Sequence, residues 1–343
     1  MRSSPLVAAS LVTALAACAS SASPPVTPCP APPAPASASA PAPASAPTPA
    51  SAPAPALAPA PPPALVPSPP PSGPPSPSTV RSSLDAASRA LASGDFAAAD
   101  PLLAAAFAAT GPDAHLRYQV ARSKAVRYAM AADFEQAAEA LVSVIPALAR
   151  HPELADEFWA HNAMMMVREA EGDPAAALAE NDQATLCAER GTWEPQERAK
   201  LAFQKDRWHR AYLTRMLAES RTGTVKQALV GYAQAALDDY RTKGFPDSIA
   251  ILDAYFAALD GRKDAALAAA RKVDPAKDDD VEDLYLVVVG LEAGGDHAAA
   301  ESVRAVMRKP GGPSLSRAIM VRWVDLDAKG PRGGGFTPWH AGG

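Results

Sequence analysis

A short pattern that recurs six times between residues 94 and 300 constrains the fold of this chain more than any other feature. In each copy a small residue, five times glycine and once alanine, is followed five positions later by alanine. The copies are GDFAAA from Gly94, ADFEQA from Ala132, GDPAAA from Gly172, GTVKQA from Gly223, GRKDAA from Gly261 and GDHAAA from Gly295. The intervals between them are 38, 40, 51, 38 and 34 residues. A period of this size predicts a stack of similar supersecondary units.

Each copy follows one helical apolar pattern and precedes another, which predicts the tight turn of a helical hairpin. Glycine permits the left-handed backbone conformation that ends a helix, and aspartate or threonine caps the helix that follows. The alanine five residues on predicts the point where the two helices touch, because a larger side chain would hold them apart. These alanines are Ala99, Ala137, Ala177, Ala228, Ala266 and Ala300.

The pattern resembles the turn of the tetratricopeptide repeat, Gly-Asp-Tyr/Phe-x-x-Ala, over about residues 81 to 308. Phe96 and Phe134 stand where that family has its aromatic residue. The resemblance implies an all-α fold, a right-handed α-solenoid of about six tetratricopeptide-like helical hairpins. Some features depart from the family: Met165 and Met216 replace a small residue, most intervals exceed the usual period of about 34 residues, and Pro101 should kink its helix.

The first 17 residues predict a signal peptide. Arg2 precedes an apolar run that ends at Ala17, and this run is too short to span a bilayer. The sequence LAAC, which ends at Cys18, resembles the lipobox of bacterial lipoproteins. That resemblance implies a lipid on Cys18 that anchors the chain to a membrane. Because no aspartate follows the cysteine, it also implies an outer-membrane lipoprotein that faces the periplasm or is exported to the surface. Cleavage as an ordinary signal peptide is the alternative.

A long charge-free region follows the signal. From Ser3 to Val80 the chain has no charged residue, and 24 of its 37 prolines lie between Pro24 and Pro77. This composition offers no apolar face, so residues 18–80 predict a disordered, extended Pro/Ala/Ser-rich stalk. Cys29 within it is either an incidental thiol or one that pairs with another chain.

Four parts follow along the chain: a lipoprotein signal peptide at 1–17, a lipid-anchored linker at 18–80, a helical-repeat domain at 81–328 and a flexible tail at 329–343. Residues 314–328 predict one last helix that caps the repeat domain. An apolar run around Leu141, Val144, Ile145 and Leu148 predicts one of its amphipathic helices.

Motifs for catalysis or metal binding are missing from the sequence, which contains no paired-histidine motif, Cys-x-x-Cys, Gly-x-Ser-x-Gly or phosphate loop. The six histidines show no ligand spacing, and Cys187 predicts a buried small residue. The acidic run at 278–285 predicts helix caps and first-turn charges, since a calcium loop would need its glycine and distal glutamate. The net charge of −5 gives no footprint for nucleic acid. We therefore expect no enzyme, cofactor, metal or nucleic-acid partner.

Two features predict binding surfaces. The 51-residue interval predicts a helix around 194–221 with a mildly basic face, either a binding element or a longer repeat with Trp193 and Trp208 packed inward. The tetratricopeptide resemblance implies a concave groove on the first helices of the hairpins, suited to an extended peptide. Counting back from each turn places eight residues there, Gln119, Arg122, Trp159, Asn162, Glu169, Arg210, Tyr255 and Tyr285.

These features together predict a membrane-anchored envelope lipoprotein that acts as a protein–protein interaction scaffold. Its expected partners are another envelope protein or peptide segment, and the membrane through the lipid on Cys18. Two alternatives remain at this point. One is an activator of a cell-wall enzyme reached through the stalk, and the other is a purely structural spacer.

Overall fold

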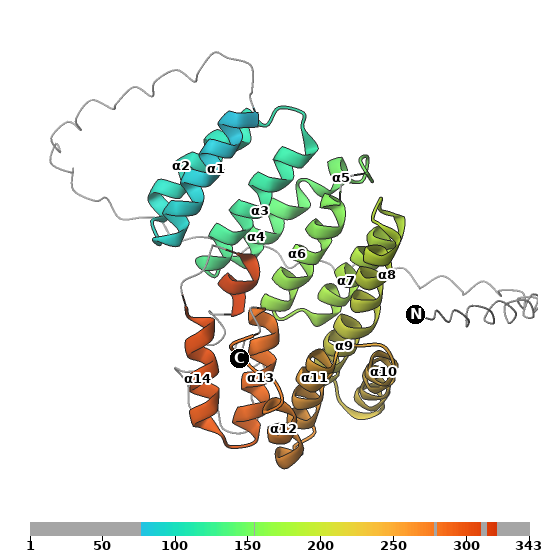
Figure 1. The fold of residues 1–343 in the computed structure, drawn as a ribbon. Helices are drawn as coiled ribbons and strands as arrows, with labels where there is room; N and C mark the ends of the chain where they lie inside the picture. The colour runs from blue at the N-terminus through green and yellow to red at the C-terminus, as the bar shows by residue number, and fades with distance from the viewer. Residues whose placement is uncertain (1–76, 154, 278–279, 310–313, 321–343) are drawn as a thin grey trace, which may run out of the picture. The chain divides into compact units, whose positions relative to one another are not determined.

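The computed structural model describes residues 77–153, 155–277, 280–309 and 314–320 (Figure 1). The predicted signal peptide, Cys18, Cys29, nearly all of the linker and the tail lie outside the described residues. The described residues form helices and turns without a strand, which confirms an all-α fold. The first helix begins at Pro77, four residues before the predicted boundary at 81. Within the described ranges, no helix combines the length and apolarity needed to cross a bilayer.

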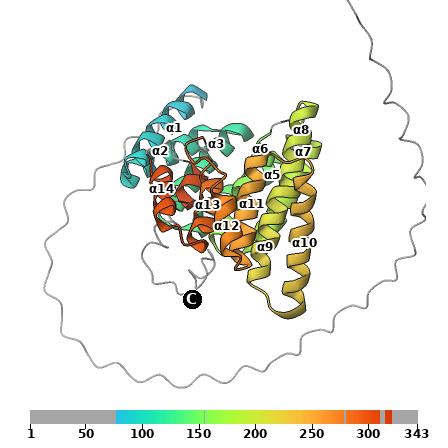
Figure 2. The same ribbon diagram turned by 60° about the horizontal axis from the view of Figure 1, so that its bottom comes forward.

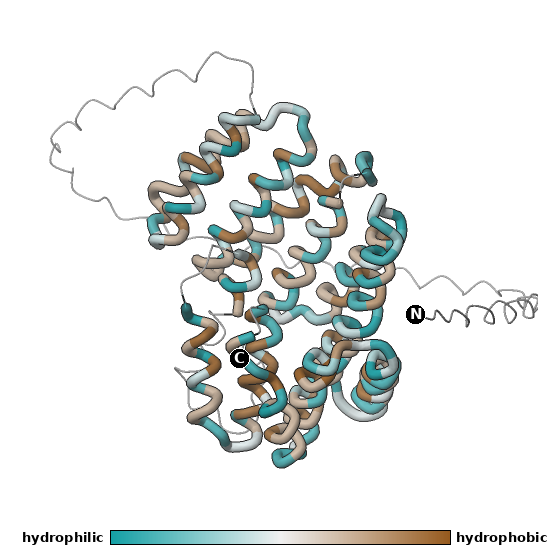
Figure 3. The backbone as a smooth tube through the Cα atoms, viewed as in Figure 1, coloured by the Kyte–Doolittle hydropathy of each residue, from teal (hydrophilic) through white to brown (hydrophobic). Residues whose placement is uncertain are grey.

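Six helical hairpins make up most of the described chain (Figure 1). Their helices pair as α1 (Pro77–Ala92) with α2 (Phe96–Ala109), α3 (Ala114–Met130) with α4 (Phe134–Val142), α6 (Asp156–Ala170) with α7 (Pro174–Arg190), α9 (Arg210–Glu219) with α10 (Gly223–Arg241), α11 (Pro246–Leu259) with α12 (Lys263–Ala270), and α13 (Val281–Ala293) with α14 (His297–Met307). Each hairpin contacts the next one along the chain. Hydrophobic residues form stripes on these helices and polar residues lie between the stripes (Figure 3), as expected for helices that each cover a neighbour.

The predicted left-handed φ is confirmed at all six hairpin turns. The predicted side-chain cap forms at four of them, and it is wrong for threonine, because Thr224 lies within α10 and does not cap it. The small residue at each turn has a φ between +59° and +82°. In four of the turns the next residue is an aspartate whose side chain accepts the backbone N–H three positions on. Ala132 is the one described residue other than glycine with a positive φ. The repeated sequence pattern is therefore a repeated backbone conformation.

The predicted contact alanines are fully buried in five hairpins, at Ala99, Ala137, Ala177, Ala266 and Ala300. The prediction is wrong for Ala228, which is exposed. The physical reason lies in α10, whose buried residues Ala233, Leu237 and Tyr240 all belong to its C-terminal half. Residues 223–228 at the start of α10 are exposed apart from half-buried Lys226, so this part of the helix is not the part that packs on its neighbours.

Prolines act differently from the expectation at two places. Helix α2 continues through Pro101 without a break. In contrast, the single helix predicted near Leu141 is divided, because α4 ends at Val142 and a short helix α5 (Ile145–Leu148) follows. Pro146 has no N–H to donate to the carbonyl of Val142, and it lies in the first turn of α5, where a proline is tolerated.

The third and fourth hairpins are joined by one long helical segment. Helix α8 (Pro195–Phe203) passes into a π-helical turn η1 (Gln204–His209) and then into α9. In Figure 2, α8, α9 and α10 lie near α7 at one edge of the helical domain. Helix α8 has no buried residue, whereas α9 is largely core and Trp208 is 3% exposed. The 194–221 segment is therefore an exposed helix only in its first part.

Segments far apart in the sequence meet around one hollow. It is lined by residues of α3, α6, α8 and η1, by Asp280 and Glu282 at the start of α13, and by Ser314–Ser316. Residues 315–320 are helical, and Leu315, Ile319 and Met320 join the main core. The described part of the predicted last helix thus packs against the core, and residues 321–328 lie outside the described residues.

Candidate functional site

The structure gathers three of the eight predicted groove residues around one surface hollow of about 570 Å³. Gln119 and Arg122 come from α3 and Trp159 from α6. A second hollow of about 330 Å³ shares Arg122 and Trp159 with the first and adds Asn162, one turn further along α6. Four of the predicted residues therefore line two adjoining hollows between α3 and α6.

The other four predicted groove residues lie elsewhere. Glu169, Tyr255 and Tyr285 are fully buried in the core and do not reach an open groove. Their burial follows from contacts between the first helices of successive hairpins. Tyr212 of α9 contacts Glu169 and the ring of Tyr255, and α11 packs on α13. Sequence spacing does not reveal these contacts. Arg210 is half-buried and is held by Asp206 and Asp182, at 3.0 and 2.8 Å.

A row of polar side chains forms one wall of the first hollow. The Nδ1 atom of His115 lies 2.6 Å from Oδ2 of Asp156, which begins α6, and Nε2 of His115 lies 2.7 Å from the side-chain amide of Gln119. With the ring proton on Nδ1, His115 donates to Asp156 and accepts from Gln119. This chain of hydrogen bonds links α3 to α6 and fixes the direction of the Gln119 side chain.

Trp159 forms the aromatic wall of both hollows. Its side chain is 42% exposed, and its ring contacts the ring of buried Phe158 edge to face at a centroid distance of 4.8 Å. Trp193, in the loop before α8, contacts both rings. Burial raises the pKa of Tyr118, which lines the same hollows, to about 12, so its hydroxyl remains a neutral hydrogen-bonding group. A rigid tryptophan beside an exposed arginine is a frequent anchor in protein recognition.

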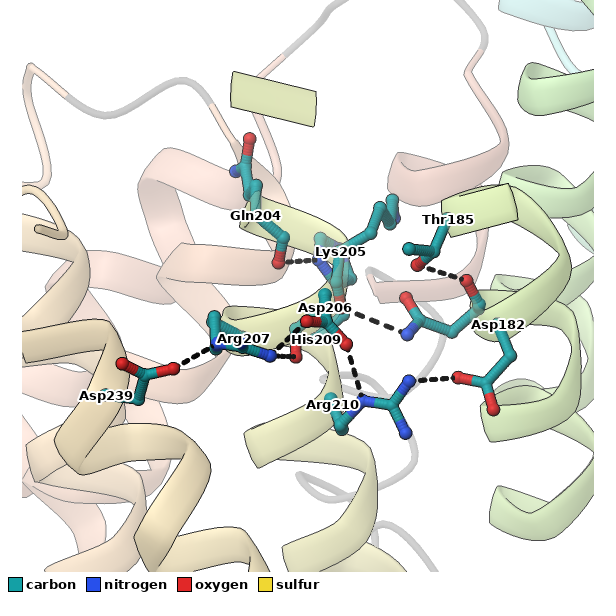
Figure 4. A network of polar contacts seen from close by, with 10 residues as sticks. Asp182, Thr185, Gln204, Lys205, Asp206, Arg207, His209, Arg210 and Asp239 are labelled. Atoms are coloured by element: carbon teal, nitrogen blue, oxygen red, sulfur yellow. Dashed lines mark hydrogen bonds and ion pairs between the residues drawn. The ribbon is translucent and has the colours of Figure 1, made fainter. Parts of the chain in front are cut away.

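The π-helical turn η1 forms the floor of the second hollow. Asn181 of α7 is fully buried and donates its side-chain N–H to the carbonyl oxygen of Lys205 at 3.0 Å. Arg207 pairs with Asp239 of α10 (Figure 4), so side chains from both neighbouring helices hold the turn. Single π-helical turns of this kind frequently occur at functional sites.

Five buried titratable side chains lie at this floor and behind it. We call them the inner polar cluster. They are Glu169 of α6, Lys205 and His209 of η1, Tyr212 of α9 and Glu282 of α13. Lys205, His209 and Glu282 also line the second hollow. The hydroxyl of Tyr212 donates to Glu169. Among the described residues, one carboxylate oxygen of Glu169 and one of Glu282 have no hydrogen-bond partner.

Burial controls the protonation of the inner polar cluster. It raises the pKa of Glu169 well above its usual value, and together with the charge of Asp280 it raises the pKa of Glu282 to about 7. Burial lowers the pKa of Lys205 to about 8, against the opposing effect of Glu282. Burial and the charge of Lys205 hold the pKa of His209 well below its usual range. Near neutral pH, Lys205 and part of Glu282 therefore carry the charge of the cluster.

The sequence analysis missed the inner polar cluster apart from Glu169. The carboxylate of Asp280 does cap α13, where it accepts the backbone N–H of Glu282 at 2.9 Å. The predicted first-turn charges are confirmed, since Glu282 and Asp283 lie in the first turn of α13. The burial of the Glu282 side chain is an addition that the sequence did not indicate. Only the long 51-residue interval pointed toward η1, and no residue type in it signals burial of Lys205.

Comparisons with known proteins found no matching family model, no similar curated protein and no similar solved structure. The function of the chain is therefore inferred from its own residues. The strongest surface feature is the pair of adjoining hollows between α3 and α6, because an exposed aromatic ring, a cation and fixed hydrogen-bonding groups converge there.

Proposed function

We propose that this chain is an envelope lipoprotein that binds an extended peptide segment of another protein in the hollows between α3 and α6. One observation carries the proposal: Trp159 of α6 lines the same hollow of about 570 Å³ as Gln119 and Arg122 of α3. A large exposed aromatic ring beside an arginine supplies the type of anchor that dominates binding energy at protein interfaces.

An extended peptide fits this surface better than a small apolar ligand. The two hollows together run across the first helices of the second and third hairpins, so an occupant has to be elongated. Their polar walls offer the side chains of Gln119 and Arg122 to backbone amides, while the ring of Trp159 offers an apolar face. A chain of alternating amide groups and side chains matches this alternation of polar and apolar contacts.

The proposal includes the tether. A lipid on Cys18 and a stalk at 18–80 hold the helical domain on a membrane, with a reach on the order of 150 Å. In this proposal the hairpins form a right-handed, tetratricopeptide-like solenoid in the periplasm or at the surface. Support comes from the six repeated turns and from the chain-order contacts between hairpins.

Site-specific photocrosslinking from the hollow tests the binding proposal. A photoreactive residue at Gln119 should crosslink to a defined protein, whereas the same residue at Tyr232, 72% exposed on α10, should not. With the captured protein purified, Trp159→Ala should weaken binding about 10-fold or more, and Tyr232→Ala should leave it unchanged. Crosslinks that appear equally from both positions contradict the proposed surface.

The nature of the captured protein separates the remaining alternatives. A synthase or hydrolase of the cell wall whose activity rises on binding makes the chain an activator. If no protein crosslinks from Gln119, a structural spacer is the alternative that remains. The anchor is tested separately: Cys18→Ala should release the protein from the membrane fraction, and full retention there contradicts the lipoprotein assignment.

A further inference from the structure

Three side chains with the chemistry of metal ligands meet between α6 and α7, away from the inner polar cluster. They are Glu157 and His161 of α6 and Cys187 of α7, and their ligand atoms all lie within 4.8 Å of one another. Glu157 and His161 are four residues apart, which places both on one face of the helix. Cys187 is 5% exposed and the side chains of Glu157 and His161 are each 11% exposed, so the three ligand groups lie together largely out of contact with water.

His161 has the carboxylate partner that a metal-bound histidine usually has. Its Nδ1 atom lies 2.6 Å from Oε2 of Glu180, one of the residues of α7. A proton on Nδ1 that is donated to this carboxylate leaves the lone pair of Nε2 free to bind a cation. Within the described ranges His161 makes no other hydrogen bond. Carboxylate partners of this kind fix the ring and raise its basicity in metal sites.

The surroundings of the three ligands suit a divalent cation with one thiolate. Arg190 donates to Sγ of Cys187 at 3.2 Å and lies 3.4 Å from Oε1 of Glu157. Burial raises the pKa of the Cys187 thiol, and the bond from Arg190 acts in the opposite direction. The arginine side chain is 60% exposed, so it can move aside. One thiolate and one carboxylate then neutralise a divalent ion in this buried place.

Room for a fourth ligand exists beside them. A narrow cavity of about 10 Å³ lies next to two of the three ligands, Glu157 and Cys187, and is also lined by Arg190 and Trp193. A cavity of this size holds about one water molecule. Three protein ligands and one water complete the four-coordinate arrangement that zinc adopts where one position stays open.

From this geometry we propose that Glu157, His161 and Cys187 bind Zn²⁺ with one open position. Sulfur, nitrogen and oxygen in one ligand set suit zinc, whereas calcium and magnesium take oxygen ligands. Binding replaces the thiol proton of Cys187, which goes to solvent, and no electron is transferred. The ion joins the start of α6 to the end of α7, next to Phe158 and Trp193, which support Trp159.

Titration of the reduced full chain with Co²⁺, a spectroscopic substitute for Zn²⁺, tests the site. The chain has three cysteines, so the experiment uses the Cys18→Ser, Cys29→Ser double variant beside the native chain. Both should bind one equivalent with thiolate-to-cobalt charge-transfer absorption, and Zn²⁺ should displace it. Adding Cys187→Ser to the double variant should abolish the absorption. Its persistence there, or its absence from the double variant, overturns the proposal.

Two further measurements guard against a variant that merely fails to fold. Glu180→Gln leaves all three ligands in place and should weaken Zn²⁺ binding about 10-fold or more at unchanged stoichiometry. Zn²⁺ should also raise the thermal midpoint of the double variant but not of the variant that also lacks Cys187. Equal Zn²⁺ affinity in Glu180→Gln and the native chain contradicts the assigned role of His161. Neither result depends on the peptide-binding proposal.

Discussion

The second hairpin turn contains an alanine where the other five turns have glycine, and this difference yields a sharp prediction. Ala132 has a φ of 59°, a conformation that costs a residue with a β-carbon roughly 1–2 kcal/mol. Ala132→Gly removes this cost, while the greater freedom of glycine in the unfolded chain takes back about 0.4–1 kcal/mol. We therefore expect Ala132→Gly to stabilise the protein by about 0.5–1 kcal/mol.

Two neighbouring substitutions calibrate this magnitude. Gly94 occupies the same place in the first turn with a φ of 73°, and no atom lies within 4 Å of a β-carbon added there. Gly94→Ala therefore tests the backbone cost without a clash, and it should destabilise by about 0.5–1 kcal/mol. Ala131 precedes Ala132 but has a φ of −88°, so Ala131→Gly gains nothing and should destabilise by about 0.5–1 kcal/mol.

Urea unfolding followed by circular dichroism measures all three variants. The midpoint should rise for Ala132→Gly and fall for Gly94→Ala and Ala131→Gly, with unchanged slopes. In thermal unfolding the shifts should be about 1–4 °C. The argument fails if Ala132→Gly and Ala131→Gly change stability in the same direction, because the opposite signs of φ at the two positions predict opposite effects.

Two other predictions follow from packing and charge. Gly290 of α13 faces α11 and α12, where an added β-carbon would lie 2.8 Å from Cβ of Ala254, so Gly290→Ala should destabilise although alanine favours helices by about 1 kcal/mol. Its control is Gly231→Ala on α10, which meets no atom within 4 Å and should stabilise in the same urea assay. Glu282 has a pKa raised from 4.5 to about 7, so its contribution to stability is complete below pH 4.5 and is lost as the pH rises through 7. The Glu282→Gln variant cannot ionise at this position and therefore avoids the loss. The stability of this variant relative to the native chain should increase from pH 5 to pH 8, and a stability difference that stays constant over this range contradicts the raised pKa.

The sequence by itself determined the local conformations. Each six-residue turn contains its own positive-φ position, and four of the six also contain a capping aspartate. These features act over distances that neighbouring residues span. For this reason the six hairpin turns and the burial of Ala99 and Ala300 were predictable. The exposed ring of Trp159 and the exposed cation of Arg122 could also be predicted, because counting along the regular helices α6 and α3 places them on the surface of the hollow.

Only the tertiary structure decided which of these side chains reach solvent. Glu169, Tyr255 and Tyr285 lie on the first helices of their hairpins, as Trp159 does, but other helices cover them. Burial of a charge depends on all the helices that surround it, and the chain brings Lys205 and Glu282 together over 77 positions. In the same way Cys187 approaches His161 only through the pairing of α6 with α7. Contacts of this kind arise from long-range packing, which leaves no periodic pattern in the sequence.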